Sequence, residues 1–377
     1  MTAATAHARA LVAAVALATA LVVVGCTACH APSAAPETEA VAPAEATPTQ
    51  RPPPTSPAPA AGASRPTRTA GPLVARTADV LAVVGRHLRV VHADGSGGRI
   101  AVPSVDAPES SVLTLAGDWS PDGRQLTFTR LHHGPEPLRS SLWVADGDGD
   151  ATREVVRCVN PCQRAGLGSW SPDGDRIAYA VSELGGRARH ARSAIEVATL
   201  SSGRRHVVAE TADRLVELTW PRWSPDGRRL VVQVIRWPRV PASSPRRASP
   251  SVRIAVLDLA RPRAQTPRVL APGLPGSHPD WSWRTGVIVF STNDPHAVDG
   301  RADRNLWTVR PDGTGLRRLT HFRPPAAAVH PSWTPDGVVL FEHCVALPAC
   351  FLAYASADGA VVQTPERLAG RWPRARP

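Results

Sequence analysis

A five-residue motif, Trp-Ser/Thr-Pro-Asp-Gly, recurs along the chain at intervals of about fifty residues and constrains its fold more than any other feature. Complete copies begin at Trp119, Trp170, Trp223 and Trp333, and a degenerate version occupies residues 281–286. A fixed period of this size is typical of repeat architectures, in which each unit packs on its neighbours. We therefore interpret most of the chain as one kind of unit, repeated.

The motif has the chemistry of a tight turn between two strands. Proline sets φ at the first corner, aspartate accepts hydrogen bonds from amides ahead of it, and glycine takes the positive φ that follows. An apolar or alternating run comes directly after every copy, which predicts a strand entered through a hairpin. These runs are Gln125–Thr129, Arg176–Val181, Arg229–Val234, Val287–Ser291 and Val338–Glu342.

A second hairpin follows in each unit, and another precedes the first motif, at Leu88–Gly95 behind a strand at Val80–Val84. Units of four short strands with two hairpin turns predict an all-β fold, a six-bladed β-propeller of four-stranded antiparallel blades. The segment Val361–Trp372 is a candidate for completing one blade. The recurring tryptophans, with Trp143 and Trp307, are expected to pack between blades.

The repeats resemble those of TolB-type, WD40-like propellers, which also occur in prolyl-oligopeptidase-like proteins. The resemblance is carried by Asn305–Thr320 and by the stretch from His330 to Gly337, and it extends over about 78–370. It implies a six-bladed TolB-like fold. Two departures are evident: the degenerate copy lacks Pro-Asp-Gly, and a Pro-rich segment stands where TolB proteins carry an N-terminal α/β domain.

The N-terminal residues have the composition of a leader and a tether. An apolar run at 10–24 follows His7 and Arg9, as in a signal peptide. Val23-Val24-Gly25-Cys26 resembles the lipobox of actinobacterial-type lipoproteins, which implies lipidation of Cys26; a plain secretory signal or an uncleaved anchor is the alternative. We expect a lipoprotein signal peptide at 1–25, a disordered Pro/Ala/Thr-rich tether at 26–76, the propeller at 77–372 and a tail at 373–377.

Strands in a blade alternate in direction, so the two ends of the blades are expected to differ. The Pro-Asp-Gly and Asp-Gly turns should lie on one face, called the turn face, and the longer connections on the other, called the long-connection face. Long loops on a rigid scaffold often bind partners. Two adjacent loops there are basic and carry the candidate partner-binding residues Arg187, Arg189, Arg192, Arg236, Trp237, Arg239, Arg246 and Arg247.

Arginine is abundant everywhere, because all 43 basic residues are arginine and the net charge is +11. The basic loops are therefore either an electropositive contact surface or ordinary solvated loops of an arginine-rich protein. A leader that removes the chain from the cytoplasm argues against nucleic acid as a partner.

Four cysteines form two close pairs, Cys158 with Cys162 and Cys344 with Cys350. In an oxidising compartment such pairs predict disulfides, and a metal site that includes His343 is the alternative. The acidic series Asp146, Asp148, Asp150 lacks the final glutamate of a calcium loop, and Asp294, Asp299 and Asp303 alternate with arginines. We therefore predict no metal and no cofactor.

The sequence contains no nucleophile elbow and no His-Glu-x-x-His motif. It favours a monomeric binding or scaffold module on the extracytoplasmic face of the membrane, held there by an N-terminal lipid, or a secreted one. The expected partner is a protein or an anionic envelope polymer, met near the third and fourth blades. Alternatives are a metal-dependent propeller enzyme, such as a lactonase or lyase, and a sensory ectodomain of a membrane partner.

Overall fold

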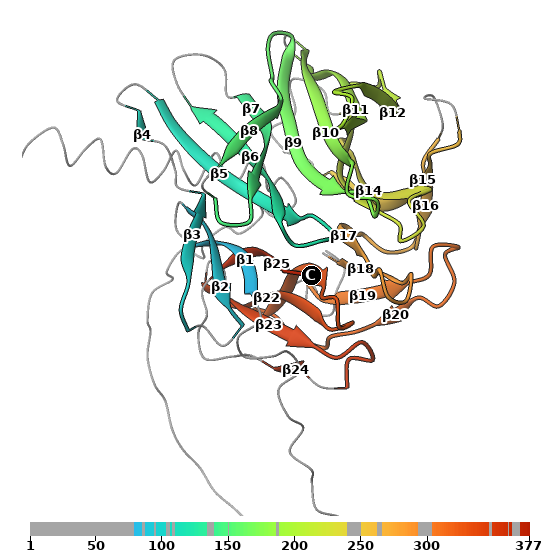
Figure 1. Cartoon of the computed structure of the whole chain (residues 1–377). Helices are drawn as coiled ribbons and strands as arrows, with labels where there is room; N and C mark the ends of the chain where they lie inside the picture. Colours follow the sequence, from blue (N-terminus) through green and yellow to red (C-terminus); the bar gives the residue numbers. More distant parts are fainter. Residues whose placement is uncertain are drawn as a thin grey trace, which may run out of the picture. The chain divides into compact units, whose positions relative to one another are not determined.

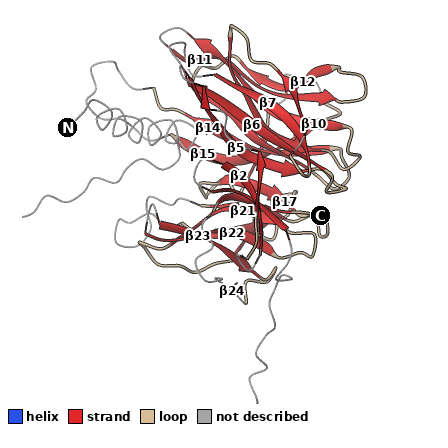
Figure 2. Cartoon of the chain, turned by 60° about the vertical axis from the view of Figure 1, so that its left-hand side comes forward, coloured by secondary structure: helices blue, strands red, loops and turns tan. Residues whose placement is uncertain are grey.

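The computed structural model describes residues 79–377, apart from 85–86, 94–95, 103–105, 108–109, 134–138, 150, 186–187, 240–249, 262–265, 293–303, 347–348, 361 and 364–369. By its internal contacts the chain divides into two units, Met1–Gly71 and Pro72–Pro377, and all described residues belong to the second. Their regular structure consists of strands (Figures 1 and 2). The described part of the chain contains no helix that could cross a membrane.

The strands form five hydrogen-bonded sheets. The first has the order β25-β1-β2-β3 and so joins the two ends of the described chain. Its strands are β1 (Asp79–Val84), β2 (His87–His92), β3 (Arg99–Val102) and β25 (Arg371–Ala375).

The second sheet has nine strands. They are β4 (Asp106–Ala107), β5 (Ser110–Trp119), β6 (Gln125–His133), β7 (Arg139–Asp146), β8 (Thr152–Val156), β9 (Cys162–Trp170), β10 (Arg176–Gly185), β11 (Ala188–Thr199) and β12 (Arg205–Thr211). One parallel pair, Ser140 with Arg164, joins β7 to β9 and so links two antiparallel groups. The predicted count of six blades therefore stays a prediction, because hydrogen bonds merge two such groups into one sheet.

The remaining sheets each contain four strands in sequential order. The third has β13 (Val216–Trp223), β14 (Arg229–Arg236), β15 (Ser251–Asp258) and β16 (Arg268–Leu270). The fourth has β17 (Ser277–Trp281), β18 (Ile288–Ser291), β19 (Leu306–Val309) and β20 (Arg317–Arg318). The fifth has β21 (Ala327–Trp333), β22 (Val339–Ala346), β23 (Ala349–Ala355) and β24 (Val362–Gln363).

Six strands, called the inner strands, contact one another in a closed series: β5, β9, β13, β17, β21 and β25. The series closes because β25 contacts β5 as well as β21. β25 supplies the strand that the first repeat lacks in sequence, and it contains residues that composition assigned to a tail. Arg376 continues this closure, since its backbone N–H donates to Asp79 O at 2.9 Å and its Nε to Gly123 O at 2.9 Å.

The motif forms the predicted hairpin turn. In the first copy, the Ser120 hydroxyl donates to Asp122 at 2.6 Å and accepts from Gln125 N–H at 2.8 Å. Gly123 has a φ of +66° and donates to Ser120 O at 2.9 Å. The serine and aspartate therefore hold the turn from within, and glycine supplies the left-handed residue.

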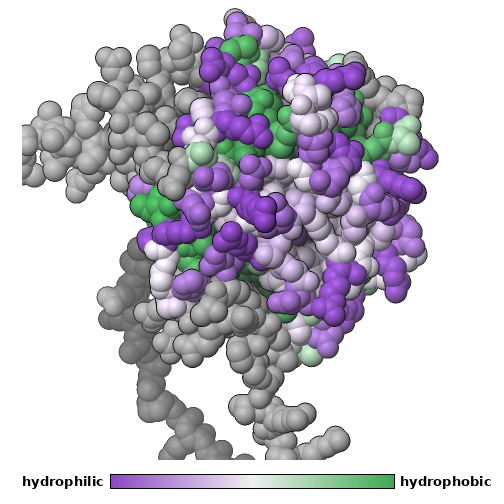
Figure 3. Space-filling view, viewed as in Figure 1, coloured by the Kyte–Doolittle hydropathy of each residue, from purple (hydrophilic) through white to green (hydrophobic). Residues whose placement is uncertain are grey.

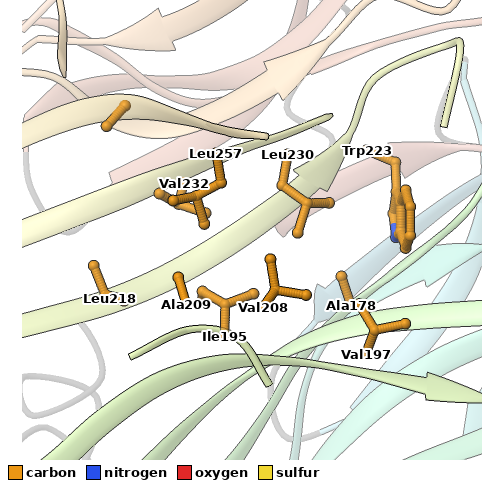
Figure 4. Packing of buried hydrophobic residues seen from close by; sticks show 11 residues of the cluster. Ala178, Ile195, Val197, Val208, Ala209, Leu218, Trp223, Leu230, Val232 and Leu257 are labelled. Atoms are coloured by element: carbon orange, nitrogen blue, oxygen red, sulfur yellow. The ribbon is translucent and has the colours of Figure 1, made fainter. Parts of the chain in front are cut away.

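The motif tryptophans pack between neighbouring sheets, as expected. Trp223 is 1% exposed and lies in a cluster with Leu230 and Val197, which come from different sheets (Figure 4). Arg176, from β10, stacks its guanidinium 4.6 Å from the Trp223 ring. Arg229 lies 5.3 Å from Trp281 and Arg376 lies 5.0 Å from Trp119 in the same way. Contacts of this kind add cation–π attraction to apolar packing between sheets.

The two predicted disulfides are present in the structure, Cys158–Cys162 and Cys344–Cys350. The second joins a cross-strand pair of β22 and β23. The first closes the connection between β8 and β9. Both therefore brace connections on the long-connection face.

Candidate functional site

The inner strands share a backbone irregularity three residues before the motif tryptophan. Leu167, Trp220, His278 and His330 have φ values of 58°, 50°, 51° and 51° there, and Trp372 in β25 has 51°. The pairing register shifts around each of them. Such a bulge bends the strand and re-aims one side chain. Left-handed backbone at residues with large side chains is strained, by about 1 kcal/mol or more each.

Four of these residues bring aromatic rings together. Trp220 and His278 have ring centroids 4.8 Å apart, His278 and His330 4.1 Å apart, and His330 and Trp372 5.7 Å apart, all edge to face. We call Trp220, His278, His330 and Trp372 the aromatic cluster. His278 and Trp372 are the second residues of β17 and β25, so the cluster lies toward the long-connection ends of these strands.

Buried polar groups hold the cluster in place. Glu342, from β22, is 2% exposed, and its Oε1 lies 2.7 Å from His330 Nδ1. The same oxygen accepts the backbone N–H of Trp372 at 2.7 Å. Gln233, from β14, accepts the backbone N–H of His278 at 2.9 Å. The cluster is therefore positioned by neighbouring strands and not only by its own backbone.

A layer of buried charges lies one residue before the motif tryptophans and, in β25, one residue before Ala375. Arg222 Nε is 3.4 Å from Asp280 Oδ1, and Arg374 Nη1 is 3.5 Å from the same oxygen. Arg374 Nε also lies 3.9 Å from Asp118 Oδ1. Asp280 further accepts the backbone N–H of Trp333 at 2.7 Å. Because these residues belong to different inner strands, the layer cross-links the inner ring.

Burial shifts the ionisation of this region. Desolvation lowers the pKa of Arg222 to about 10, and the charge of Arg374 acts in the same direction. Desolvation also raises the pKa of Asp280, against the opposing effect of the two arginines. The pKa of His278 lies well below its usual value because of burial first, with His330, Arg374 and Arg222 adding to the effect. His278 is therefore neutral at pH 7.

A small pocket lies among these residues. It is lined by the aromatic cluster with Gly117, Arg222, Pro331, Pro373 and Arg374. Its free space corresponds to about one water molecule. Within the described residues, His278 Nδ1 and Trp372 Nε1 have no hydrogen-bond partner. The pocket can therefore accept one small polar group, with aromatic surface around it.

The pocket lies at the inner strands, whereas the predicted contact residues lie in outer connections. Arg187, Arg246 and Arg247 fall outside the described residues, and of Arg189 only its place in β11 is described. Arg239 is exposed, and Arg236 pairs with Asp213 at 3.2 Å. Trp237 is only 8% exposed, so its ring packs inside the fold and is not presented to a partner.

Arg192 is matched by three carboxylates. Its nitrogens lie 3.0 Å from Glu183, 3.2 Å from Glu196 and 3.0 Å from Glu210. Hydrogen bonds to these glutamates raise its pKa although partial burial opposes them. The basic contact surface near the third and fourth repeats stays a prediction, and two of its described arginines, Arg192 and Arg236, have their charges paired.

The other sequence candidates are distributed as follows. Asp148 pairs with Arg99 at 3.3 Å, and Asp150, Asp294, Asp299, Asp303 and Cys26 lie outside the described residues. Among described side chains, one group has three ligand atoms close enough for a metal, Glu342 with Cys344 and Cys350. Its two sulfurs are bonded to each other, so they are not available as thiolate ligands.

The aromatic cluster was missed in the sequence, although a signal exists. Its members begin the related tetrapeptides Trp220-Pro-Arg-Trp, His278-Pro-Asp-Trp, His330-Pro-Ser-Trp and Trp372-Pro-Arg-Ala. Proline inside a strand is confined to edges and bulges, because it cannot donate to the ladder. An aromatic residue before a proline, found in four of the six inner strands, therefore marks a re-aimed side chain.

Comparison with known proteins supports the fold. No protein-family model matches the chain. The Tol-Pal system protein TolB of Nitratidesulfovibrio vulgaris is 46% identical over 46 residues, which cover 12% of this chain and only a tenth of that protein.

Solved structures match over most of the chain. TolB from Acinetobacter baumannii superposes with a TM-score of 0.56 and 16% identity, over 80% of this chain and 67% of that one. A putative TolB from Agrobacterium tumefaciens gives 0.52 and 20%, over 79% and 91%. A puromycin-hydrolysing peptidase of Mycobacterium tuberculosis gives 0.51 and 17%, over 77% of this chain and 45% of the peptidase. The fold is a TolB-like all-β propeller, which occurs both in TolB and within a peptidase chain.

Proposed function

We propose that this TolB-like propeller is an extracytoplasmic binding module, anchored by lipid on Cys26 and spaced from the membrane by residues 26–76, that holds a protein partner at its aromatic cluster. The fold supports a binding or scaffold role in general. The anchor is supported by the leader composition and by Val23-Val24-Gly25-Cys26.

The aromatic cluster is the single observation that carries the binding site. Four rings from four inner strands converge there on strained backbone. Leu167 has the same backbone without lining the pocket, so the bulge alone does not require an aromatic residue. Strain and unpartnered polar atoms that gather in one place are typical of sites kept for binding.

The size of the pocket favours a protein over a polymer. It accepts about one water-sized group, so a partner can insert a single side-chain tip while the rest covers the surrounding rim. Trp220 and Trp372 are only 5% and 6% exposed, so their rings line the pocket and would meet only the tip of an inserted side chain. A partner surface with one protruding polar group therefore fits better than a repeating envelope polymer, which would need an extended groove.

Photo-crosslinking in cells tests the site. A photoreactive residue at Val159 or Val345, which are exposed beside the two disulfides, should capture the same protein. Trp220→Ala should abolish this capture, whereas the same probe at Leu316 on the turn face should not yield that protein. Capture that persists unchanged in Trp220→Ala would contradict the site. Identification of the captured protein also shows whether the partner is embedded in the membrane or soluble. A sensory ectodomain requires a membrane-embedded partner.

Fractionation tests the anchor separately. Cys26→Ser should remove lipid labelling and release the chain from lipid-dependent membrane attachment. A chain that is labelled equally with and without Cys26 would rule out the proposed lipidation.

A second candidate function is catalysis by His330. Its Nδ1 is oriented by buried Glu342, an arrangement in which a carboxylate fixes the imidazole for proton transfer at Nε2. Turnover of a panel of lactones and uronate oligomers, lost in His330→Gln but retained in Arg239→Gln, would support this candidate.

A further inference from the structure

The degenerate motif copy produces a turn unlike the other four. At its tip Trp283 and Arg284 replace proline and aspartate, so an acidic tip becomes basic and gains an indole ring. Trp283 is 46% exposed, in contrast to the buried motif tryptophans. The turn is still ordered by hydrogen bonds, because Gly286 N–H donates to Ser282 O at 2.9 Å. Trp283 is therefore a surface residue held in a defined position by an ordered turn.

Neighbouring turn residues extend this feature. The register pairs Ile288 with Val309, which places Arg310 beside the end of the Trp283 turn. Arg268 donates to Pro311 O, and so brings β16 next to the same region. We call the exposed residues Arg268, Trp283, Arg284, Arg310, Leu316 and Arg317 the turn-face patch.

The arginines of this patch bond to backbone carbonyls of adjacent turns. Arg284 Nη1 donates to Asp336 O at 3.1 Å, and Arg317 donates to Ala357 O at 2.9 Å and to Asp358 O at 3.0 Å. No ion pair within 4 Å is formed by Arg268, Arg284, Arg310 or Arg317 among the described residues. Such bonds position a guanidinium without cancelling its charge. The nearby carboxylates Asp312 and Asp358 have lowered pKa values, because turn N–H and hydroxyl groups bond them and because the charges of Arg310 and Arg317 act in the same direction.

The chain enters the propeller on the turn face. Asp79 begins β1 opposite the end of β25, and Arg376 joins Asp79 to Gly123 of the first motif turn. The predicted tether, residues 26–76, ends three residues before Asp79. With lipid on Cys26, as proposed above, the face that receives the tether is kept close to a bilayer.

We propose that the turn-face patch docks on the anionic lipid surface of the membrane, with the Trp283 ring at headgroup level and its arginines on lipid phosphates. Tryptophan is enriched at that depth because its ring is apolar and its N–H polar. Arginines near an anionic leaflet are attracted to it. Much of the surface is hydrophilic in the view of Figure 3, where apolar residues gather only in small areas. Four of the six residues of the patch are arginines, so docking through one indole and several arginines suits it better than insertion of a broad apolar face.

Quenching by brominated lipids tests the proposal with the whole chain. The protein is extracted from membranes and reconstituted into vesicles of brominated phosphatidylglycerol or brominated phosphatidylcholine. Tryptophan fluorescence should be quenched in the first vesicles and not in the second, and quenching should fall at about 1 M salt, where the Debye length is about 3 Å. Trp283→Phe should abolish the quenching, and Arg284→Glu with Arg310→Glu should weaken it.

Matched controls exclude trivial results. Arg239→Glu, a single charge reversal matched to Arg284→Glu alone, lies at an exposed arginine on the long-connection face and should leave the quenching intact. Thermal unfolding should show that Trp283→Phe is folded. Quenching that survives Trp283→Phe would overturn the proposal, and so would a lack of quenching in anionic vesicles. In the second case, an acidic protein found to bind the patch would be its partner instead. A chain that proves soluble contradicts the Cys26 anchor, and the soluble chain added to the same vesicles still tests the patch.

Discussion

The basic loops of the long-connection face and the turn-face patch hold their arginines differently, although other turn-face arginines, such as Arg176 with Asp173, are paired with carboxylates. On the long-connection face, Arg192 is enclosed by three glutamates and Arg236 pairs with Asp213. On the turn face, Arg284 and Arg317 bond to carbonyl oxygens and keep their charge available. The number of arginines in a loop therefore does not locate a basic surface. What matters is whether each guanidinium bonds to a carboxylate or to a neutral carbonyl oxygen.

Removal of β25 is expected to have the largest effect on stability, because this strand closes the ring of inner strands. Ending the chain after Gly370 removes β25, which pairs with β1 and carries Trp372 and Arg374. The aromatic cluster and the charge layer both lose members, and the first sheet loses its inner strand. We expect loss of cooperative thermal unfolding by circular dichroism. Ending the chain after Ala375 removes only Arg376 and Pro377, and should lower the midpoint by a smaller amount.

Removing a charge from the buried layer should lower the free energy of unfolding far more than removing one from an exposed ion pair. Asp280→Asn leaves Arg222 and Arg374 without their shared carboxylate. Breaking a buried pair typically costs about 3–5 kcal/mol. Asp213→Asn, which breaks the exposed pair with Arg236, should cost about 0–1 kcal/mol. Denaturant titrations measure both, and equal losses would refute the distinction.

The paired arginine of the long-connection face should be structural. Arg192→Met leaves three carboxylates close together, so we expect a loss of about 1–3 kcal/mol. Arg284→Met on the turn face should change the free energy of unfolding by no more than about 0.5 kcal/mol. Should the two substitutions prove equivalent, pairing would not be what distinguishes Arg192 from the arginines of the turn-face patch.

Low pH should reduce the free energy of unfolding, because His278 of the aromatic cluster is buried in its neutral form. Its folded-state pKa lies well below 6.5, so below about pH 6.5 the unfolded chain binds a proton at this residue that the folded chain does not bind. This contribution is complete above pH 6.5 and is lost as pH falls below it, at about 1.4 kcal/mol per unit. The free energy of unfolding of the unaltered chain should therefore fall more between pH 7 and pH 5.5 than that of His278→Gln. Parallel pH profiles would contradict this assignment.

The sequence predicted the hairpins, the buried tryptophans and both disulfides, because each depends on residues close together along the chain. Asp122, Gly123 and Ser120 define their turn locally, as do Cys344 and Cys350 their hairpin. The aromatic cluster depends on bulges in four strands far apart in sequence, and the pairing of Arg192 depends on glutamates of three strands. Such features follow from register and side-chain direction, which periodicity alone does not specify.

The place of β1 has a mechanical consequence. β1, which follows the predicted tether and begins at Asp79, is not an edge strand, since it is hydrogen-bonded to β25 on one side and to β2 on the other. A pull along the tether is therefore resisted by two ladders at once, and by the contacts of Arg376 with Asp79. If the chain is anchored as proposed, tension from the membrane would therefore enter the domain through a strand that is hydrogen-bonded on both sides.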